Sequence, residues 1–519
     1  MVALFAACGK SNQPAASPAT GGTPSPRATG GPVARLDMAE ASPILTVRTA
    51  GLMDFQTGVS SLATGDFNGD GVGDLLIGLP FADGPDEGRE DAGEAVVIFG
   101  GAGLEGEIDL AEDELGLRVL GALPGDTLGF GVAAGDLNGD GIDDVIVGAP
   151  GSNGLQPVRT DLGEAYVVFG RRDLGGTVDT ARVEQDFTLI AAEGFARLGT
   201  SFAVADVNDD GIADLIAGAP FGGRQPGTPP GGPRTTLGEV YVVFGAEDLA
   251  GGVSVAEDEQ AVLIAGAREL DSFGESVAAA DVNGDGVADI IVGARGFDGP
   301  EGKNDDAGVV MVFIGSAGLG GRLGVDDAGL TILGRDAGDG LGAVVASGDF
   351  NGDGLADIVA ANRTGEGSGN TPASSVEAYI VLGSDSPSGT LDTASQEPDA
   401  IVYGAEQGAL TATALATGDL DGDGRDDLLL GTPLAPQSGR ALSGLVYLVF
   451  GRDLSGAIEL SGDAWGGLVI QGADEGDALG TGAIVGDVHG DGRLRIVLAA
   501  AGDQGAEKDV GKIYVVGLP

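Results

Sequence analysis

The sequence predicts an all-β chain that folds as a seven-bladed β-propeller with four antiparallel strands in each blade. A nine-residue acidic loop, Asp-x-Asn-Gly-Asp-Gly-x-x-Asp, recurs seven times, and its copies are 68 to 75 residues apart. Short runs rich in Val, Ile and aromatic residues lie between the loops, bounded by Gly and Pro, as is typical of strands. So regular a period indicates one unit copied seven times, and four strands per unit indicate a propeller. The loops begin at Asp66, Asp136, Asp206, Asp281, Asp349, Asp419 and Asp487.

The repeat at residues 127–192 illustrates the unit. Residues 129–135 lead into the acidic loop, residues 144–150 leave it, and residues 163–170 and 187–191 form the third and fourth runs. The third run is almost continuously apolar, which predicts a strand covered on both faces. It recurs at residues 94–99, 164–169, 239–244, 309–314, 376–382, 445–450 and 512–516.

The two ends of the repeat array complement each other. The seventh unit ends after its third run, whereas residues 44–48 before the first unit resemble a fourth strand. We expect this N-terminal strand to dock against residues 512–516 and close the ring, because an open ring would leave two unpaired sheet edges.

The N-terminal residues predict a separate organisation. Residues 2–7 are apolar and precede Cys8, the only cysteine, so no disulfide can form within the chain. Residues 1–8 resemble a truncated lipoprotein signal with lipidation at Cys8; the alternative is an ordinary N-terminus with a buried or free thiol. Residues 9–43 are predicted as a Pro/Ser/Gly-rich flexible linker and residues 44–519 as the propeller. No apolar stretch is long enough to span a bilayer, so membrane contact is expected only through a lipid on Cys8.

Composition excludes several functions. The net charge of -54 disfavours nucleic-acid binding through a basic surface. One histidine and one cysteine exclude His-based triads, zinc sites and Cys–His pairs within the chain. We therefore expect no enzymatic activity, although carboxylate or Tyr/Arg chemistry leaves no readable motif and stays open.

The acidic loops predict calcium sites. Positions 1, 3, 5 and 9 supply side-chain oxygens and position 7 a backbone carbonyl, which suits the six to eight oxygen ligands of Ca²⁺. Glycine at position 6 permits the sharp reversal of the chain. The alternative, a metal-free Asn-Gly or Asp-Gly turn, does not explain the acids at positions 1 and 9. The predicted ligands are Asp66, Asn68, Asp70, Val72 and Asp74; Asp136, Asn138, Asp140, Ile142 and Asp144; Asp206, Asn208, Asp210, Ile212 and Asp214; Asp281, Asn283, Asp285, Val287 and Asp289; Asp349, Asn351, Asp353, Leu355 and Asp357; and Asp419, Asp421, Asp423, Arg425 and Asp427.

Two loops depart from the pattern. The third has Asp209 where the others have Gly, which adds charge and strains the turn, and we still expect calcium there. In the seventh loop, Asp487–Arg495, Arg495 replaces the last carboxylate and His489 replaces Asn. An arginine repels a cation and can pair with Asp487 and Asp491, so we expect about six Ca²⁺ ions and an empty seventh loop. We expect His489, the only histidine, to be a hydrogen-bonded loop residue rather than a metal ligand.

Short signatures flank the loops. Phe130 and Gly131 precede the second loop, and Gly148, Ala149 and Pro150 follow it. Phe273-Gly274 with Gly293-Ala294-Arg295, and Ser201-Phe202 with Gly218-Ala219-Pro220, are variants. These motifs resemble the FG-GAP repeat of integrin alpha-chain propellers. The resemblance implies seven blades, calcium in the hairpin between strands 1 and 2 on one face, and the 2–3 and 4–1 loops on the other. It suggests a free-standing bacterial relative.

These inferences predict an extracellular or cell-surface calcium-binding module for adhesion or ligand binding, most simply a monomer. The expected partner is a protein or glycan on the face that bears the 2–3 and 4–1 loops, because long loops on a rigid scaffold commonly carry binding. Basic residues in these loops indicate a face for an acidic ligand, with solvated charge as the alternative: Arg89, Arg159, Arg224, Arg234, Lys303, Arg363 and Arg440. A structural component of an envelope assembly and a hydrolase or phospholipase-like enzyme on the same scaffold are the other functions considered.

Overall fold

The computed structural model describes the repeat array in fourteen segments: residues 32–49, 61–84, 88–113, 116–153, 162–191, 195–223, 236–254, 261–300, 302–362, 377–404, 413–436, 439–461, 465–502 and 511–518. The predicted lipoprotein signal at residues 1–8, Cys8 and the linker as far as residue 31 lie outside these residues.

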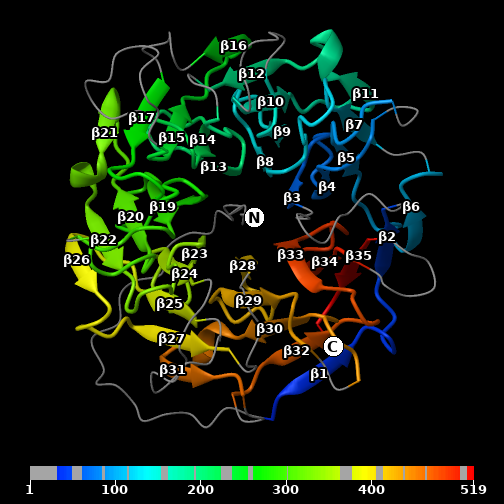
Figure 1. Cartoon of the computed structure of the whole chain (residues 1–519). Helices are drawn as coiled ribbons and strands as arrows, with labels where there is room; N and C mark the ends of the chain where they lie inside the picture. The colour runs from blue at the N-terminus through cyan, green and yellow to red at the C-terminus, as the bar shows by residue number, and fades with distance from the viewer. Residues whose placement is uncertain are drawn as a thin grey trace.

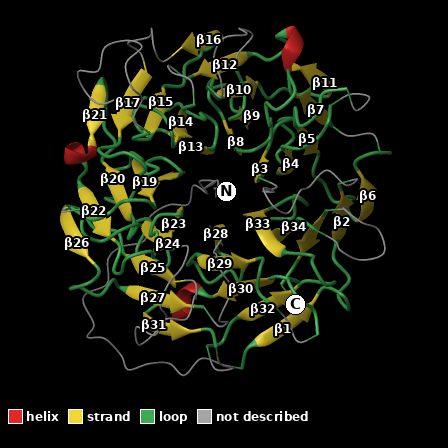
Figure 2. Cartoon of the chain, viewed as in Figure 1, coloured by secondary structure: helices red, strands yellow, loops and turns green. Residues whose placement is uncertain are grey.

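Seven sheets surround a central axis, with the first strand of each repeat innermost and the later strands towards the rim (Figure 1). The all-β, seven-bladed prediction is therefore confirmed. The helical segments of the described residues are single 3₁₀ turns (Figure 2): η2 (Thr180–Arg182), η3 (Val325–Asp327) and η4 (Gly451–Asp453). Among the described residues, no helix has the length and apolar character needed to cross a membrane.

The strands of the first four blades run from the axis outward in the following order. Blade 1 consists of β3 (Leu62–Gly65), β4 (Asp74–Leu79), β5 (Glu94–Ile98), β7 (Leu117–Leu120) and β11 (Gly176–Asp179). Blade 2 consists of β8 (Val132–Gly135), β9 (Asp144–Ala149), β10 (Glu164–Val168), β12 (Phe187–Ile190) and β16 (Gly251–Ser254). Blade 3 consists of β13 (Ser201–Ala205), β14 (Asp214–Ala219), β15 (Glu239–Val243), β17 (Ala261–Ala265) and β21 (Arg322–Gly324). Blade 4 consists of β18 (Ser276–Ala280), β19 (Asp289–Ala294), β20 (Val309–Phe313), β22 (Leu330–Leu333) and β26 (Gly389–Asp392).

The remaining three blades follow the same order. Blade 5 consists of β23 (Val344–Gly348), β24 (Asp357–Ala361), β25 (Glu377–Val381), β27 (Ala400–Tyr403) and β31 (Gly456–Glu459). Blade 6 consists of β28 (Ala414–Gly418), β29 (Asp427–Thr432), β30 (Leu445–Val449), β32 (Leu468–Gln471) and β1 (Ala34–Asp37). Blade 7 consists of β33 (Leu479–Gly486), β34 (Arg495–Ala500), β35 (Lys512–Val516), β2 (Leu45–Arg48) and β6 (Gly106–Asp109).

The prediction of four strands per blade is wrong, because each sheet has five. The fifth strand is parallel and comes from a different repeat: β11 of the second repeat pairs with β7 of blade 1, in the register Gly176–Leu117 to Asp179–Leu120. Five of the seven added strands begin with glycine, and all seven expose their first residue, so they carry no apolar run that sequence reasoning could detect. The added strand covers the outer edge of the fourth strand and links neighbouring blades.

The N-terminal segment completes two blades. β2 pairs antiparallel with β35, from Leu45 opposite Val515 to Arg48 opposite Lys512, so the predicted docking is confirmed. β1 pairs in parallel with β32 of blade 6, which corrects the assignment of residues 9–43 to a linker, since residues 34–37 are a strand. One short segment thus supplies the outer strands that the seventh repeat lacks.

The core consists of apolar layers between adjacent blades. The third strands are buried along their length, as predicted; only Lys512, at the start of β35, is half-buried. A Cβ on Gly148 would lie 2.1 Å from the carbonyl oxygen of Gly199, so only glycine permits this approach of the next blade. The seven acidic loops join the first and second strands, so they all lie at one end of the ring.

Candidate metal centres

Each acidic loop is wrapped around its own carboxylates, as the second loop shows. The Asp136 carboxylate accepts the amides of Asp140 (3.1 Å) and Gly141 (2.7 Å). The Asn138 side-chain oxygen accepts the amide of Asp140 (2.9 Å), and the Asp140 carboxylate accepts that of Ile142 (2.9 Å). These bonds turn the side-chain oxygens of positions 1, 3 and 5 towards the inside of the turn, where one cation would meet all of them.

The central bond of this turn recurs in every copy. In all seven loops the position 1 carboxylate accepts the amide of the position 6 glycine at 2.7 to 2.9 Å. The structure therefore brings together the side chains that the sequence predicts at positions 1 to 5. The coordination of calcium, including the carbonyl of position 7, stays a prediction.

The position 9 aspartates have a second role. Their Oδ1 atoms accept the amide of the glycine that follows the third strand (2.8 to 2.9 Å). Their Oδ2 atoms accept the amide of position 2 (2.9 to 3.1 Å). Each carboxylate is at most 1% exposed, so it braces the loop against the third strand from inside the blade. The sequence indicated a ligand here but not this brace.

Burial next to other acids makes these carboxylates electrostatically unfavourable. Burial raises the pKa of Asp74, Asp289 and Asp357 to about 6, with a further increase from the acids at positions 1 and 5. Burial and neighbouring acids also raise the pKa of the position 9 residues of the second, third and sixth loops to about 7: Asp144, Asp214 and Asp427. In the sixth loop these acids are those of positions 1 and 3. A cation beside them would stabilise the charged form. The donor set thus fits a hard divalent cation.

The third loop accommodates its extra aspartate. Asp209 adopts a left-handed backbone with φ 63°, close to φ 72° of Gly139 in the second loop. Its amide donates to the Asp206 carboxylate at 2.7 Å. Aspartate tolerates this conformation better than most residues, so the turn keeps its shape.

The sixth loop has the densest group of carboxylates. Ligand atoms of Asp419, Asp421 and Asp423 all lie within 4.8 Å of one another. The Arg452 guanidinium donates to Asp421 and lies 3.8 Å from Asp423. A positive side chain therefore already lies against these acids, at the place where a metal cation would be attracted.

The seventh loop balances its charge internally. Arg495 Nη2 donates to Asp491 at 2.8 Å, and Nη1 donates to the carbonyl of Arg493 at 2.8 Å. The hydrogen bond from Arg495 lowers the pKa of Asp491. The predicted pairing of Arg495 with Asp491 is confirmed, whereas Asp487 accepts the amides of Asp491 and Gly492. Arg495 thus occupies the sequence position at which the other six loops have the buried aspartate, but its guanidinium binds the exposed Asp491.

The hydrogen bond expected of His489 is not found in the described part of the chain, whereas its exclusion as a metal ligand stays a prediction. Both ring nitrogens are buried and neither has a hydrogen-bond partner among the described residues.

Adjacent loops are also joined to each other, which sequence reasoning missed. The amide of position 8 donates to the position 1 carbonyl of the preceding loop, as from Asp143 to Asp66 (3.1 Å) and from Asp426 to Asp349 (2.8 Å). The Asp143 and Asp426 side chains accept the return bond from the same residues at 2.9 Å. In the second and sixth loops, the aspartate at position 8 is the sequence feature that could have indicated these bonds.

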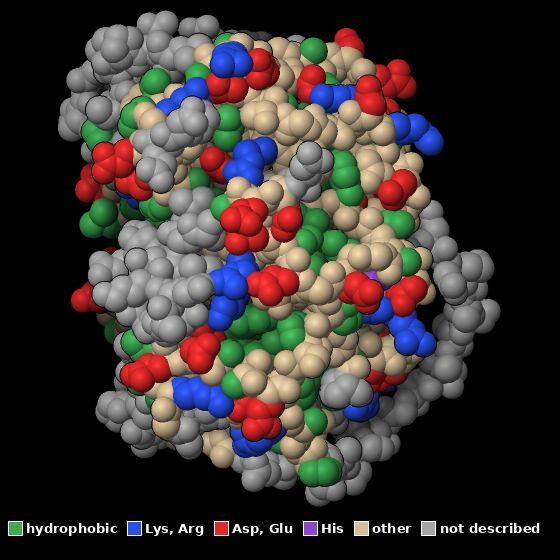
Figure 3. Space-filling view, turned by 90° about the vertical axis from the view of Figure 1, so that its right-hand side faces the viewer, with side chains coloured by type: hydrophobic (Ala, Val, Ile, Leu, Met, Phe, Trp, Pro, Cys, Tyr) green, Lys and Arg blue, Asp and Glu red, His purple; other side chains and the backbone are tan. Residues whose placement is uncertain are grey.

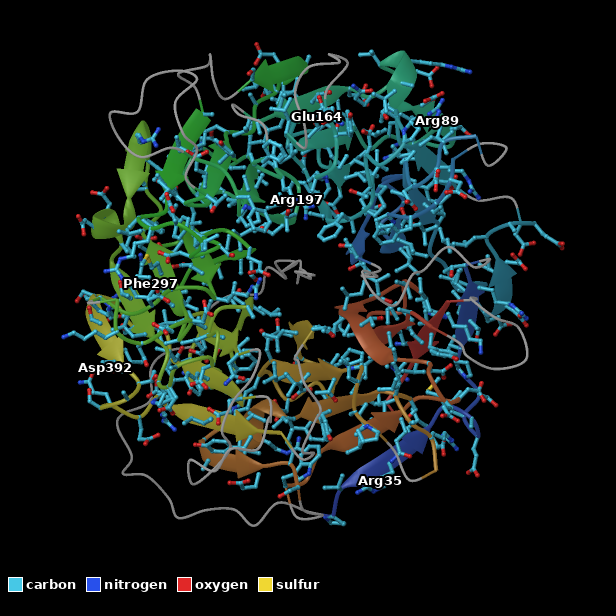
Figure 4. The ribbon with its side chains drawn as sticks, viewed as in Figure 1. Arg35, Arg89, Glu164, Arg197, Phe297 and Asp392 are labelled. Carbon is cyan, nitrogen blue, oxygen red and sulfur yellow. The ribbon has the colours of Figure 1, made fainter. Side chains whose placement is uncertain are left out.

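The opposite face bears the 2–3 and 4–1 loops. Arg89, which lies beside β11 in Figure 4, donates two hydrogen bonds to Asp179 (2.8 and 2.9 Å). Arg440 binds Asp37 in the same way (2.7 and 2.9 Å). Each arginine thus fixes a 2–3 loop to the added fifth strand, so these two are structural rather than free for a ligand. Arg159, Arg224, Arg234 and Arg363 lie outside the described residues. Side chains of both signs are interleaved on the side of the molecule in Figure 3.

Comparison with known proteins agrees with this fold. The FG-GAP repeat model matches residues 58–98, 128–168, 198–243, 273–313, 341–376 and 411–449. The human phosphatidylinositol-glycan-specific phospholipase D is 33% identical over 214 residues, which is 40% of this chain and 23% of that protein. Integrin alpha pat-2 of Caenorhabditis elegans is 29% identical over 253 residues (45% and 17%), and integrin alpha-PS2 of Drosophila melanogaster 28% over 246 residues (46% and 15%). The matched part therefore spans less than a quarter of each of these relatives.

The matched ranges also refine the signature. Four of the six ranges begin at Leu128, Leu198, Phe273 and Leu341, and each of these residues forms an isolated bridge with a glycine before a third strand. The counterparts of Phe273-Gly274 are thus Leu128-Gly129 and Leu198-Gly199, not Phe130-Gly131 and Ser201-Phe202. The phenylalanine-like residue packs between blades, a place that leucine also fills.

Proposed function

We propose that this FG-GAP repeat protein is an extracellular calcium-binding propeller that serves as an adhesion or ligand-binding module. In this proposal calcium is structural: it holds the six inner hairpins of repeats 1 to 6, while the seventh loop, balanced by Arg495, takes none. Ligands bind on the opposite face. The relatives named integrin alpha support this role.

The observation that carries the proposal is the position 9 carboxylate. In six loops it is buried and held by two amides; in five of them it lies near the acids of positions 1 and 5, and in the sixth near those of positions 1 and 3. Without a cation this arrangement raises its pKa by two to three units, from 3.8 to about 6 or 7. Clustered buried acids of this kind are unfavourable unless they are paired or bind a metal. Because this unfavourable free energy recurs in six loops, we expect each of these loops to hold a cation in the native protein.

Bound calcium would supply positive charge and additional oxygen coordination at each turn. The chain supplies the rest of the rigidity. Position 9 links the turn to the third strand, and in five loops the amide of position 8 links the turn to the preceding one. Order at the calcium end is therefore transmitted along the strands to the 2–3 and 4–1 loops, which we propose as the ligand face.

The cell exterior is the compartment that suits these sites. Calcium modules outside the cell remain loaded even with affinities of about 10⁻⁴ to 10⁻³ M, because calcium is abundant there. The large negative charge and the predicted lipidation of Cys8 agree with a surface location. A protein or glycan is the proposed ligand class.

A second candidate function follows from one comparison. The similarity to phosphatidylinositol-glycan-specific phospholipase D favours a role next to lipid-linked substrates, as the binding part of a hydrolase or as an enzyme itself. The described residues offer recurring buried pairs such as Glu164–Tyr166 and Glu239–Tyr241 on the ligand side. Each pair is buried within its blade, which suits a structural role better than catalysis.

The test combines binding arrays with calcium control. The full chain is applied to glycan and extracellular-protein arrays in 2 mM Ca²⁺ and in EDTA, and phospholipase activity on a glycan-linked phosphatidylinositol is measured in parallel. We expect calcium-dependent binding to one ligand class and no turnover. Turnover without stable binding would instead establish the enzyme, and calcium-independent binding would reject the structural role of the loops.

A further inference from the structure

In most repeats, a leucine lies in the turn that follows the third strand, and we call it the plug leucine because it packs between neighbouring blades. In the first four repeats this leucine is Leu104, Leu174, Leu249 or Leu319, and in the sixth it is Leu454; its amide donates to the carbonyl three residues earlier at 2.8 to 3.0 Å. Leu104 and Leu174 are buried, and Leu174 packs in the apolar layer between blades 1 and 2. The leucine therefore fills the space between its own blade and the preceding one.

The fifth repeat begins the same turn but does not complete it. The amide of Ser384 donates to the carbonyl of Val282 (3.0 Å), as that of Arg171 does to Phe67 (3.0 Å) in the second repeat. Three residues after Ser384, where the leucine belongs, stands Pro387. Proline has no amide hydrogen for the Ser384 carbonyl and no branched chain to enter the space.

A hollow of about 300 Å³ lies at this place, lined by residues of blades 4 and 5 that include positions in β22, β25 and β26. Figure 1 shows these two blades as neighbours in the ring. Its apolar lining includes Val282, Ile358, Val381 and Leu391, from strands and loops of both blades. Cavities of about 150 Å³ lined by such residues already hold a ring the size of benzene. This hollow is therefore large enough for a leucine side chain.

The mouth of the hollow is polar and acidic. Glu397 and Asp399 line it together with serine hydroxyls. Asp399 accepts the amide of Leu382 at 2.9 Å, and Glu397 pairs with Arg335 at 3.0 Å. Two carboxylates against one guanidinium leave negative charge at the mouth, which favours a positively charged neighbour of the occupant.

We propose that this hollow binds a leucine side chain of a partner peptide that has a basic residue next to the leucine. The leucine replaces the plug that the other repeats supply themselves, and its own amide meets the Ser384 carbonyl. The site lies at the calcium-loop end of the ring, so it is distinct from the ligand face proposed above and does not depend on it.

The test uses three capped dipeptides on the full chain in excess calcium. Acetyl-Leu-Lys-amide is titrated while the methyl resonances of Val282, Ile358 and Leu391 are followed by NMR. We expect saturable shifts at these methyls, binding at least about tenfold weaker for acetyl-Ala-Lys-amide because three buried carbons are lost, and weaker binding for acetyl-Leu-Glu-amide. Equal responses to all three peptides, or no shifts at these methyls, would overturn the proposal.

Two variants at one position supply the matched control. Pro387→Leu restores the plug, so it should abolish the shifts and raise the melting temperature. Pro387→Ala restores only the amide hydrogen and leaves the hollow open, so binding should persist within a few-fold. Unchanged binding by folded Pro387→Leu would reject the site. If that variant does not fold, loss of binding by Pro387→Ala, or equal responses to the three peptides, would still overturn the proposal.

Discussion

Replacing Asp144 by Asn should change stability in opposite directions with and without calcium. Asp144 is fully buried, accepts amides of Leu137 and Gly170 at 2.9 Å each, and has its pKa raised by burial to about 7. At pH 8 without metal, a shift of about three units from 3.8 costs about 4 kcal/mol. Asparagine removes the charge but keeps only one acceptor oxygen, so one amide loses its partner at a cost of about 1–3 kcal/mol. The net expectation in EDTA is a gain of about 1–3 kcal/mol.

In calcium the same substitution should destabilise the protein. The charge of Asp144 is then compensated, so its removal brings no relief and weakens the site. For a site with Kd of about 10⁻⁵ M in 1 mM Ca²⁺, lost binding alone is worth about 2.7 kcal/mol. The assay is urea unfolding at pH 8 in 1 mM Ca²⁺ and in EDTA. Asp140→Asn is the matched control: Asp140 is exposed in the same loop, so it should be neutral within about 0.5 kcal/mol in EDTA and destabilising in calcium.

Equal destabilisation by Asp144→Asn in calcium and in EDTA would contradict this prediction. If Asp144→Asn lowers the free energy of unfolding by the same amount in both buffers, position 9 acts only as a hydrogen-bond brace and no cation compensates its charge.

Three other predictions concern the loops and the ring. The position 9 aspartates have pKa values of about 6 to 7 in the folded protein and 3.8 in the unfolded chain, so the metal-free protein binds extra protons when it folds. Its melting temperature in EDTA should therefore rise as pH falls from 8 towards 5. A melting temperature that decreases over this pH range would contradict the burial argument. Leu45→Ala, in a fully buried position of β2, should cost about 2–5 kcal/mol in urea unfolding, whereas exposed Thr177→Ala should cost under about 0.5, and equal effects would argue against closure by β2. Arg495→Asp should add one calcium ion per chain by equilibrium dialysis, and an unchanged count would show that Arg495 is not what keeps the seventh loop empty.

The fold was readable from the sequence where the signal was local and apolar. The third strands, such as residues 164–168, carry unbroken apolar runs because neighbouring blades cover both faces. The fifth strands, such as β11, could not be found this way, since their pairing is parallel, distant in sequence and half exposed. β1 was hidden for the same reason inside a segment whose composition suggested a linker.

The sequence identified the residues of each loop but not their hydrogen-bond partners outside the loop. Spacing alone placed Asp136, Asn138, Asp140 and Asp144 in one turn. It could not show that Asp144 also joins the turn to Gly170, because that contact links residues 26 apart through the blade. Nor could it show that Arg89 is held by Asp179 across 90 residues of sequence. The first pairing depends on how the strands of one blade pair, and the second on the order of the blades, which residue patterns within one repeat do not encode.

The number of calcium ions per chain tests the central claim most directly. The full chain, stripped of metal and dialysed against millimolar ⁴⁵Ca²⁺ at pH 7.5, should bind six ions, one in each loop that has a buried carboxylate at position 9. Binding of no calcium under these conditions would contradict the account, because the clustered acids would then be stable without the cation on which it depends.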